Sequence, residues 1–238
     1  MKCDFIIDIG NSNFKVAALQ NNEIASVHRF NADEYLDLIQ LVKNKNVILS
    51  NVSKGELKIL LQANCNLIFT SNNAIHFPFY SEYKTKETWG MDRACNVTAA
   101  QHYYPQRNVL IVDVGTCIKF DVIDDKNTYL GGSISPGIRL RLKSLASQTA
   151  NLPLLQPNKE FDLIGKSTNE SIINGVINGC YAEIIGLIRQ YEKKFADLLI
   201  IMTGGDSFYF DFKEKSNIFA DENLTLKGLY QLYLFNEE

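Results

Sequence analysis

The same short pattern opens both halves of the chain, and it constrains the fold more than any other feature of the sequence. Residues 4–9 (DFIIDI) run into the turn Gly10-Asn11-Ser12, and residues 109–113 (VLIVD) run into the turn Gly115-Thr116. A short apolar run that stops at a glycine turn is typical of a buried strand. Because each run carries an Asp near its end, we interpret the two halves as copies of one architecture.

Hydrophobic spacing predicts a similar series of elements in each half. In the first half we expect strands at 4–9, 14–20, 23–30, 47–49 and 67–69, with helices after Asn31 and at 54–63. In the second half we expect strands at 109–113, 117–123, 128–134 and 198–203, with helices near 137–148, 169–195 and 223–235. The order βββαβαβ therefore predicts an α/β protein with two lobes, each a mixed sheet with flanking helices.

A boundary between the lobes is expected near Pro105, where polar residues interrupt the apolar pattern. This divides the chain into residues 1–106 and 107–238. Helix 169–195 carries enough apolar positions to serve either as a core helix or as a surface for a partner.

Composition excludes several classes of protein. The net charge of −3 argues against nucleic acid or an anionic membrane as a partner. No apolar run approaches the roughly 20 residues that span a bilayer, and the first residues do not form a signal peptide. The five cysteines are scattered without a CxxC pair and the three histidines lie far apart, so neither disulfides nor zinc are expected. We expect a cytoplasmic protein.

The two turns have the chemistry of phosphate binding. Gly10 lets backbone N–H groups approach a phosphate, Asn11 and Ser12 add neutral donors, and Lys15 adds a positive charge. Asp8 and Asp113 each end a buried strand, where a carboxylate is costly unless it is paired or binds a cation. Two such carboxylates predict one cation–phosphate cluster in a phosphotransfer cleft.

A third turn follows the last predicted strand of the second half. Residues 203–206 (TGGD) place two glycines where backbone could lie flat against a ligand. Each of the three turns taken singly also fits an ordinary hairpin or a strand-to-helix connection. Their joint occurrence in one chain favours a binding role.

The three turns, in this order, resemble the phosphate-1, phosphate-2 and adenosine motifs of the actin-like ATPase superfamily. The resemblance spans nearly the whole chain and implies two ribonuclease-H-like, actin-like lobes. Residues 83–93 (YKTKETWGMDR), 131–137 (GGSISPG) and 165–175 (GKSTNESIING) narrow it, because they look like segments of type III pantothenate kinases. That family has a Tyr seven residues before a G-x-D-R motif, and Tyr83 stands in this relation to Gly90.

Three positions depart from the family pattern. Ser12 replaces the usual Thr and keeps its hydroxyl. Lys86 stands where the family often has Pro, and Trp89 is bulkier than the usual aliphatic residue. These changes bear on substrate geometry rather than on the class of reaction.

The resemblance implies ATP-dependent phosphorylation of pantothenate to 4′-phosphopantothenate, the first step of coenzyme A synthesis. It implies that Asp92 is the general base and that Arg93 binds the substrate carboxylate. Further substrate contacts are implied for Tyr83, Gly90, Met91 and Thr168. Without the resemblance, Asp92 and Arg93 would be interpreted as a helix-start acid beside a surface arginine.

The resemblance also assigns the nucleotide site and its ions. ATP contacts are implied for Asp8, Ile9, Gly10, Asn11, Ser12, Asn13, Phe14, Lys15, Thr116, Gly204 and Gly205. Asp8 would hold Mg²⁺, and Asp113 would hold a monovalent cation, K⁺ or NH₄⁺. A homodimer is implied, with the substrate pocket near the subunit interface.

Two alternatives remain open at the level of sequence. The chain could be another actin-like kinase, with an acyl, sugar or other small alcohol as substrate. It could also be a nucleotide-binding regulator of the same fold without turnover. The presence of Asp8, Asp92 and Asp113 together favours an enzyme.

Overall fold

The structure of the protein is a computed structural model, which describes residues 2–10, 13–51, 56–70, 75–210, 212 and 217–237. The chain forms two compact units. The first unit comprises Met1–Pro105, Asn127–Tyr129 and Asn223–Glu238, and the second comprises Gln106–Lys126 and Leu130–Glu222. The division into lobes 1–106 and 107–238 stays a prediction.

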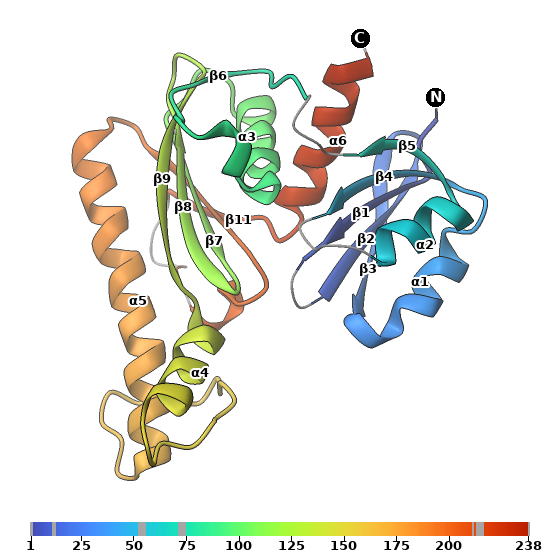
Figure 1. Ribbon diagram of the computed structural model, residues 1–238. Helices are drawn as coiled ribbons and strands as arrows, with labels where there is room; N and C mark the ends of the chain where they lie inside the picture. The colour runs from blue at the N-terminus through green and yellow to red at the C-terminus, as the bar shows by residue number, and fades with distance from the viewer. Residues whose placement is uncertain are drawn as a thin grey trace. The chain divides into compact units, whose positions relative to one another are not determined.

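A five-stranded mixed sheet forms the centre of the first unit (Figure 1). Its strands, in spatial order, are β3 (Glu23–Asn31), β2 (Asn13–Gln20), β1 (Phe5–Ile9), β4 (Asn46–Asn51) and β5 (Asn66–Thr70). β1 pairs antiparallel with β2 and parallel with β4. Because β1 is central, the Asp that follows its apolar residues is held between two neighbouring strands.

Alternation along β1 sends its side chains to opposite faces of this sheet. Ile7 and Ile9 pack in one cluster with residues of α1 (Tyr35–Leu41) and α2 (Glu56–Asn64). Ile6 packs in another cluster with residues of α3 (Met91–Tyr103) and α6 (Leu224–Glu237). The sheet of the first unit is therefore covered by helices on both faces.

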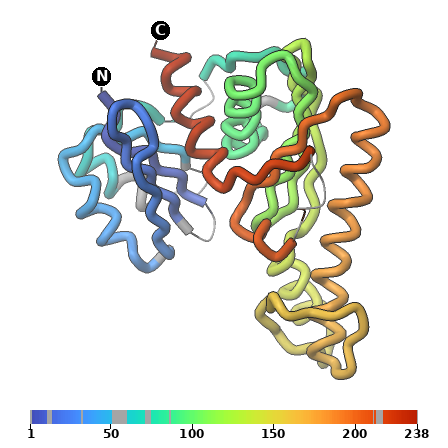
Figure 2. Tube along the Cα trace, turned by 180° about the vertical axis from the view of Figure 1, so that it is seen from behind, coloured from blue at the N-terminus to red at the C-terminus, as the bar shows by residue number. Residues whose placement is uncertain are grey.

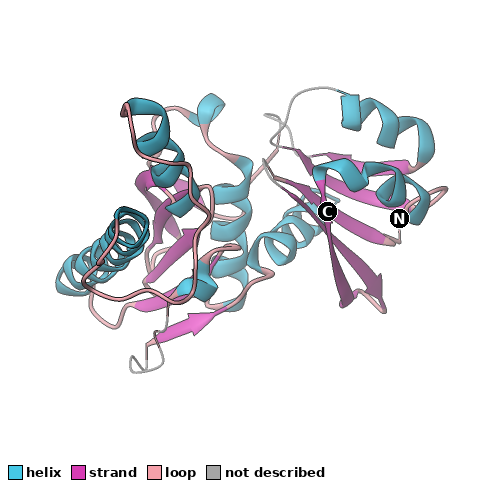
Figure 3. Cartoon of the chain, turned by 90° about the horizontal axis from the view of Figure 1, so that it is seen from below, coloured by secondary structure: helices cyan, strands magenta, loops and turns pink. Residues whose placement is uncertain are grey.

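The second sheet repeats the strand order of the first. Its strands are β9 (Thr128–Pro136), β8 (Cys117–Ile123), β7 (Val109–Val114), β10 (Leu199–Thr203) and β11 (Ile218–Ala220). As in the first sheet, the earliest strand is central, antiparallel to the second and parallel to the fourth. A short strand, β6 (Tyr80–Ser81), pairs in parallel with the first two residues of β9. The predicted duplication is thus present in the strand topology, and Figure 3 shows helices against both sets of strands.

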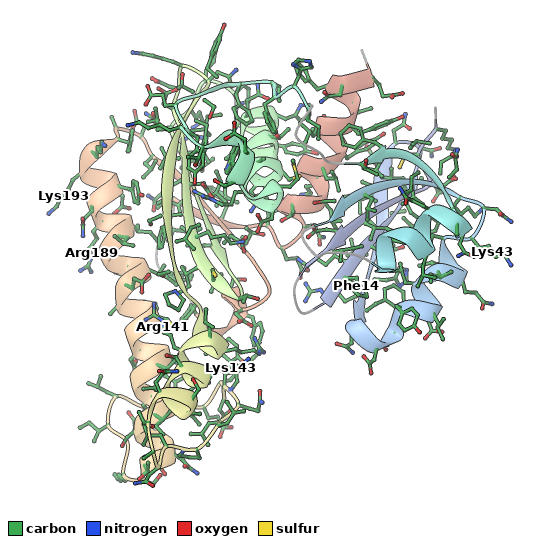
Figure 4. All side chains as sticks on the ribbon, viewed as in Figure 1. Phe14, Lys43, Arg141, Lys143, Arg189 and Lys193 are labelled. Carbon is green, nitrogen blue, oxygen red and sulfur yellow. The ribbon has the colours of Figure 1, made fainter. Side chains whose placement is uncertain are left out.

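Helix α5 (Thr168–Lys194) packs on one face of the second sheet, and α4 (Ile138–Gln148), which follows β9, packs against α5. Figure 2 shows α5 running along the strands of this unit, and its buried side includes Ile177, Ile184 and Ile188. In Figure 4, Arg189 and Lys193 lie on the side of α5 that faces away from the strands. Among the described residues α5 is the one helix whose length and composition would let it cross a membrane. Since its apolar side packs in the hydrophobic core, it is a core helix.

Helix α3 was not predicted, because it lacks an apolar stripe. Its residues from Arg93 to Ala100 are all buried, and several of them are small or polar. A helix that is buried all round gives no amphipathic periodicity. Its neighbour is α6, where Gly228 lies so close that an added Cβ would be 1.7 Å from the carbonyl oxygen of Cys95.

The predicted fold class is confirmed: the chain is α/β, with two mixed sheets and flanking helices. Each predicted strand lies within one or two residues of an observed one. The second half departs from the simple repeat because α4 and α5 follow β9 without a strand between them. The described part of the connection from β10 to β11 contains only the short 3₁₀ helix Ser207–Tyr209.

Candidate active site

The phosphate-1 turn of the first unit follows β1. Asp8 lies opposite Lys15 of β2 and beside Ser50 of β4 in the sheet register. Opposed residues of a sheet project to the same face, which here is the face that carries Ile6 and packs against α3 and α6. Asn11 and Ser12, predicted to contact ATP, lie outside the described residues, as does the side chain of Asn13.

The G-M-D-R segment forms the beginning of α3. Gly90 is the N-cap and Asp92 lies in the first turn. The carboxylate of Asp92 folds back over the cap: its Oδ1 accepts a hydrogen bond from the N–H of Arg93 at 2.9 Å, and a Cβ on Gly90 would lie 2.6 Å from it. Glycine at this position leaves room for the carboxylate, and the helix dipole favours a negative charge there.

Asp8 and Asp92 both lie near one buried thiol, Cys95 of α3. Burial is the main reason why the pKa of Cys95 lies well above its ordinary value, and the charges of Asp8 and Asp92 raise it further. Both carboxylates therefore act on the same place in the first unit, although they come from residues far apart in the sequence. Carboxylates are the ligands that commonly hold a magnesium ion together with substrate phosphates.

Arg93 is buried, with 4% of its surface exposed, and tyrosine hydroxyls hold its guanidinium. Its Nη2 donates to the hydroxyl of Tyr129 at 2.9 Å, and its Nη1 donates to the hydroxyl of Tyr83 at 3.3 Å. The guanidinium carbon also lies 5.4 Å from the centre of the Tyr83 ring. The two hydroxyls orient the guanidinium, whose planar fork of donors is the group that proteins use to bind carboxylates.

Trp89 is the centre of an aromatic cluster that fixes these tyrosines. Its ring stacks on Tyr129 at 4.6 Å with an interplanar angle of 13°, and it lies 5.8 Å from the ring of Tyr83. Phe77 and Phe79 pack on its other sides. The bulky ring of Trp89, which departs from the family pattern, thus packs against both tyrosines that bind Arg93.

Tyr129 was not among the predicted site residues. It lies in the apolar segment TYLGGSI of β9, where a buried tyrosine is ordinary. It lies beside Ser81 of β6 in the sheet, and its hydroxyl meets Arg93, which is 36 residues earlier in the chain. No local signal in the sequence indicates this pairing.

The phosphate-2 and adenosine turns meet in the second unit. Gly204 has φ of +93°, and an added Cβ would lie 2.3 Å from the carbonyl oxygen of Val114 and 2.5 Å from Oδ1 of Asp113. The N–H of Asp206 donates to the same carbonyl at 2.8 Å. Only glycine, which tolerates positive φ, lets the two turns touch in this way.

The segment GGSISPG also belongs to this group of turns. The N–H of Gly137 donates to the carbonyl oxygen of Thr116 at 3.0 Å, and a Cβ on Gly137 would clash with Gly115. Arg139, two residues later, forms an ion pair with the buried Asp206. The hydrogen bond from Arg139 to Asp206 is the main cause that raises the pKa of the arginine. Three motifs far apart in the sequence thus form one surface of the second unit.

Asp113, which was predicted to hold a monovalent cation, forms an ion pair within the second sheet. Lys119 of β8 lies opposite Asp113 in the register, and its Nζ is 2.6 Å from Oδ2 of Asp113. The other carboxylate oxygen faces Gly204. A cation that shared Oδ2 would meet an ammonium of the same sign.

Thr168 lies at the beginning of α5, after the N-cap Ser167. It is exposed and lines a pocket of about 1170 Å³ in the second unit. The polar lining also includes Arg141 and Lys166, and Figure 4 shows Arg141 between α4 and α5. Arg141 forms an ion pair with Glu183, so the pocket offers hydroxyl groups together with the ammonium of Lys166.

The predicted site residues fall into two groups. The first unit carries Asp8 to Gly10, Phe14, Lys15, Tyr83 and Gly90 to Arg93, and the second unit carries Asp113, Thr116, Thr168, Gly204 and Gly205. Within each unit the structure brings together residues from distant parts of the sequence. Their roles stay predictions.

Comparison with known proteins gives the family. The family model for type III pantothenate kinase matches residues 5–190. The chain belongs to the type III pantothenate kinase family. It is 40% identical to a type III pantothenate kinase of Christiangramia forsetii, over 98% of this chain and 99% of the relative. It is 38% identical to one of Phocaeicola vulgatus, over 99% of both chains.

Solved structures support the fold. A protein of Campylobacter jejuni, described as a Baf family transcriptional activator, superposes with a TM-score of 0.63 at 24% identity, over 98% of both chains. A protein of Listeria monocytogenes, described as an N-acetylmannosamine kinase, superposes with a TM-score of 0.50 at 13% identity, over 98% of this chain and 99% of the other. At these identities the likeness concerns the fold alone.

Membership of the type III pantothenate kinase family makes the chain a kinase, as the resemblance of its motifs indicated. The matched residues extend from β1 into α5 and include the G-M-D-R segment. The glycine turn after β10 lies beyond the family match but within the alignments with the two relatives, which span nearly the whole chain.

Proposed function

We propose that the protein transfers the γ-phosphoryl group of ATP to the primary alcohol of pantothenate, giving 4′-phosphopantothenate and ADP in the first step of coenzyme A synthesis. One observation carries the proposal: the first turn of α3 presents the carboxylate of Asp92 beside the buried guanidinium of Arg93, which two tyrosines hold. This neighbourhood supports the proposal that Asp92 acts as base and Arg93 binds an anion, since the acceptor carries both an alcohol and a carboxylate.

The base accepts a proton and the arginine orients the acceptor. An oxygen–phosphorus bond forms between the pantothenate hydroxyl and the γ-phosphorus, while the bond from that phosphorus to the ADP oxygen breaks. The hydroxyl proton goes to Asp92. A carboxylate is far too weak a base to deprotonate a free alcohol, so the proton moves with or after formation of the new bond. Arg93 binds the pantothenate carboxylate by charge-assisted hydrogen bonds.

The nucleotide would be held by the glycine turns. Lys15, the turn after β1 and Thr116 would bind phosphate, and Gly204 and Gly205 would lie along the adenosine. Mg²⁺ fits Asp8, because this hard ion is commonly held by one or two carboxylates together with substrate phosphates. When bound, it would neutralise charge on the transferred phosphoryl group.

Release of ADP in a coupled assay with pantothenate tests the proposal directly. We expect turnover with ATP, Mg²⁺ and pantothenate, and a product whose mass is that of the phosphorylated acceptor. N-Acetylglucosamine and acetate serve as control acceptors. Phosphorylation of either, with none of pantothenate, would reject the assignment in favour of another actin-like kinase.

A regulator without turnover is the second candidate, because a structural neighbour is described as a transcriptional activator. At 24% identity that likeness supports the fold only. ATP binding measured by calorimetry, with no ADP release for any acceptor, would favour this candidate. The intact first turn of α3 argues for the enzyme.

We expect a cytoplasmic homodimer with α5 at the subunit interface. Tyr181 of α5 is 39% exposed. The pocket that Thr168 lines is formed partly by residues at the beginning of the same helix. Sedimentation analysis tests the oligomeric state. A monomer at working concentrations would remove the dimer from the proposal and leave the chemistry of Asp92 untouched.

Tyr129 should matter for the affinity of the acceptor. Its hydroxyl accepts a hydrogen bond from a buried charged donor, and such bonds are worth about 1.5–3 kcal/mol. Tyr129→Phe should therefore raise the KM for pantothenate by roughly tenfold or more, with little change in the KM for ATP.

Tyr80→Phe is the matched control, because Tyr80 lies in the neighbouring strand β6 and is 77% exposed. We expect it to behave as the unsubstituted protein does. If Tyr129→Phe and Tyr80→Phe gave the same KM for pantothenate, Tyr129 would have no part in positioning Arg93.

A further inference from the structure

The ion pair between Lys119 and Asp113 is built into the central hairpin of the second sheet. Asp113 is the residue of β7 that precedes the phosphate-2 turn, and Lys119 faces it across the antiparallel register. The 2.6 Å from Nζ to Oδ2 is at the short end of the range for a charge-assisted hydrogen bond. Both side chains are mostly buried, with 15% of Lys119 and 12% of Asp113 exposed.

The backbone of the TGGD turn packs against the Asp113 carboxylate on the side opposite Lys119. Oδ1 of Asp113 lies 2.5 Å from the place where a Cβ on Gly204 would be, so the TGGD turn lies against it. Potassium must exchange its hydration shell for several oxygen ligands. An oxygen that already binds an ammonium, beside another that faces tightly packed backbone, does not offer such a shell.

From this geometry we infer that the ammonium of Lys119 occupies the place of a monovalent cation at the phosphate-2 turn. An ammonium and a potassium ion each carry one positive charge and bind carboxylate oxygen at similar distances. The lysine supplies this charge permanently, because it is tethered to β8 and needs no ion from solution. It offsets the charge of Asp113 beside Thr116, where the proposed function expects ATP phosphates.

The consequence is a kinase whose activity does not depend on potassium or ammonium. At constant ionic strength, which keeps general screening equal, the unsubstituted protein should have rates within about twofold in sodium, potassium, ammonium and choline chloride. Activation by potassium or ammonium of about tenfold or more over choline would overturn the inference.

Removal of the tethered charge should create a need for an ion. Lys119→Met keeps an unbranched side chain one atom shorter and removes the charge, and it should lower the rate in choline by about tenfold or more. Potassium or ammonium should restore part of the loss. Lys126→Met is the matched control, since Lys126 is exposed in the turn after β8, and it should show neither effect. An unaltered rate for Lys119→Met, without a response to potassium, would overturn the inference.

Ion binding can be measured without turnover, which separates this inference from the proposed function on which it rests. An ion that binds only the folded state raises the melting temperature. Potassium in place of choline should leave the melting temperature of the unsubstituted protein unchanged and raise that of Lys119→Met. A rise for the unsubstituted protein, with none for Lys119→Met, would refute the inference even if pantothenate were not the substrate. If Lys119→Met did not fold, the rates and melting temperatures of the unsubstituted protein would still decide the question.

Discussion

Asp92→Asn is expected to lower turnover by about two to four orders of magnitude, as for the loss of a positioned base, and to leave ATP binding largely unchanged. The amide keeps the shape of the side chain, and its oxygen can still accept the hydrogen bond that Oδ1 of Asp92 receives from the N–H of Arg93. The beginning of α3 should therefore stay intact. What the variant loses is the ability to accept the hydroxyl proton of the acceptor.

The measurement pairs steady-state ADP release with calorimetric titration of ATP. Glu87→Gln is a matched control, because Glu87 is an exposed acid five residues earlier in the same unit. It should keep both turnover and binding. Unchanged turnover in Asp92→Asn would remove Asp92 from the mechanism, whereas loss of ATP binding would indicate a structural or metal-binding role.

Gly228→Ala is expected to destabilise the first unit strongly. An added Cβ at this position would lie 1.7 Å from the carbonyl oxygen of Cys95, and the obstructing atom is backbone that no rotamer change can move. Overpacking of this kind costs about 1–3 kcal/mol. In a chain of this size that corresponds to a fall in melting temperature of roughly 2–12 °C. Since α6 must move away from α3, Asp92 and Arg93 should also be displaced and activity should fall.

Gly186→Ala is the control for helix propensity. Gly186 lies within α5, and an added Cβ would meet no atom within 4 Å. Alanine there should stabilise the helix by about 0.5–1 kcal/mol. Thermal unfolding followed by circular dichroism compares the two variants. If both glycines tolerated alanine equally, α3 and α6 would not be in the close contact described.

The sequence was sufficient for the strands and for the turns that follow them. β1 and β7 are apolar runs that end at glycine, and this local pattern is independent of what packs on the sheet. The amphipathic helix α5 was predicted for the same reason, since its apolar positions recur at helical spacing. The motif order was sufficient to indicate the family, which the comparisons bear out.

The sequence did not predict helix α3, nor did it predict that α6 packs against α3. The residues from Arg93 to Ala100 are buried on every side, so their pattern carries no periodicity. The C-terminal helix was predicted from its own residues, but nothing local indicates that it packs against a helix more than a hundred residues earlier. Such contacts depend on how the surfaces of distant segments fit together. Here the fit requires that Gly228 has no Cβ, so that α6 can approach α3 closely.

The partners of the charged site residues were likewise decided by the tertiary structure. Asp113 and Arg93 are evident in the sequence as candidates, but Lys119 and Tyr129 are not. The sequence by itself determined which residue types stand at the strand ends and hence the class of chemistry, because backbone turns and strand propensity are local properties. Strand register and helix packing decided which charges meet, because the energy of an ion pair depends on distances that only the folded chain sets.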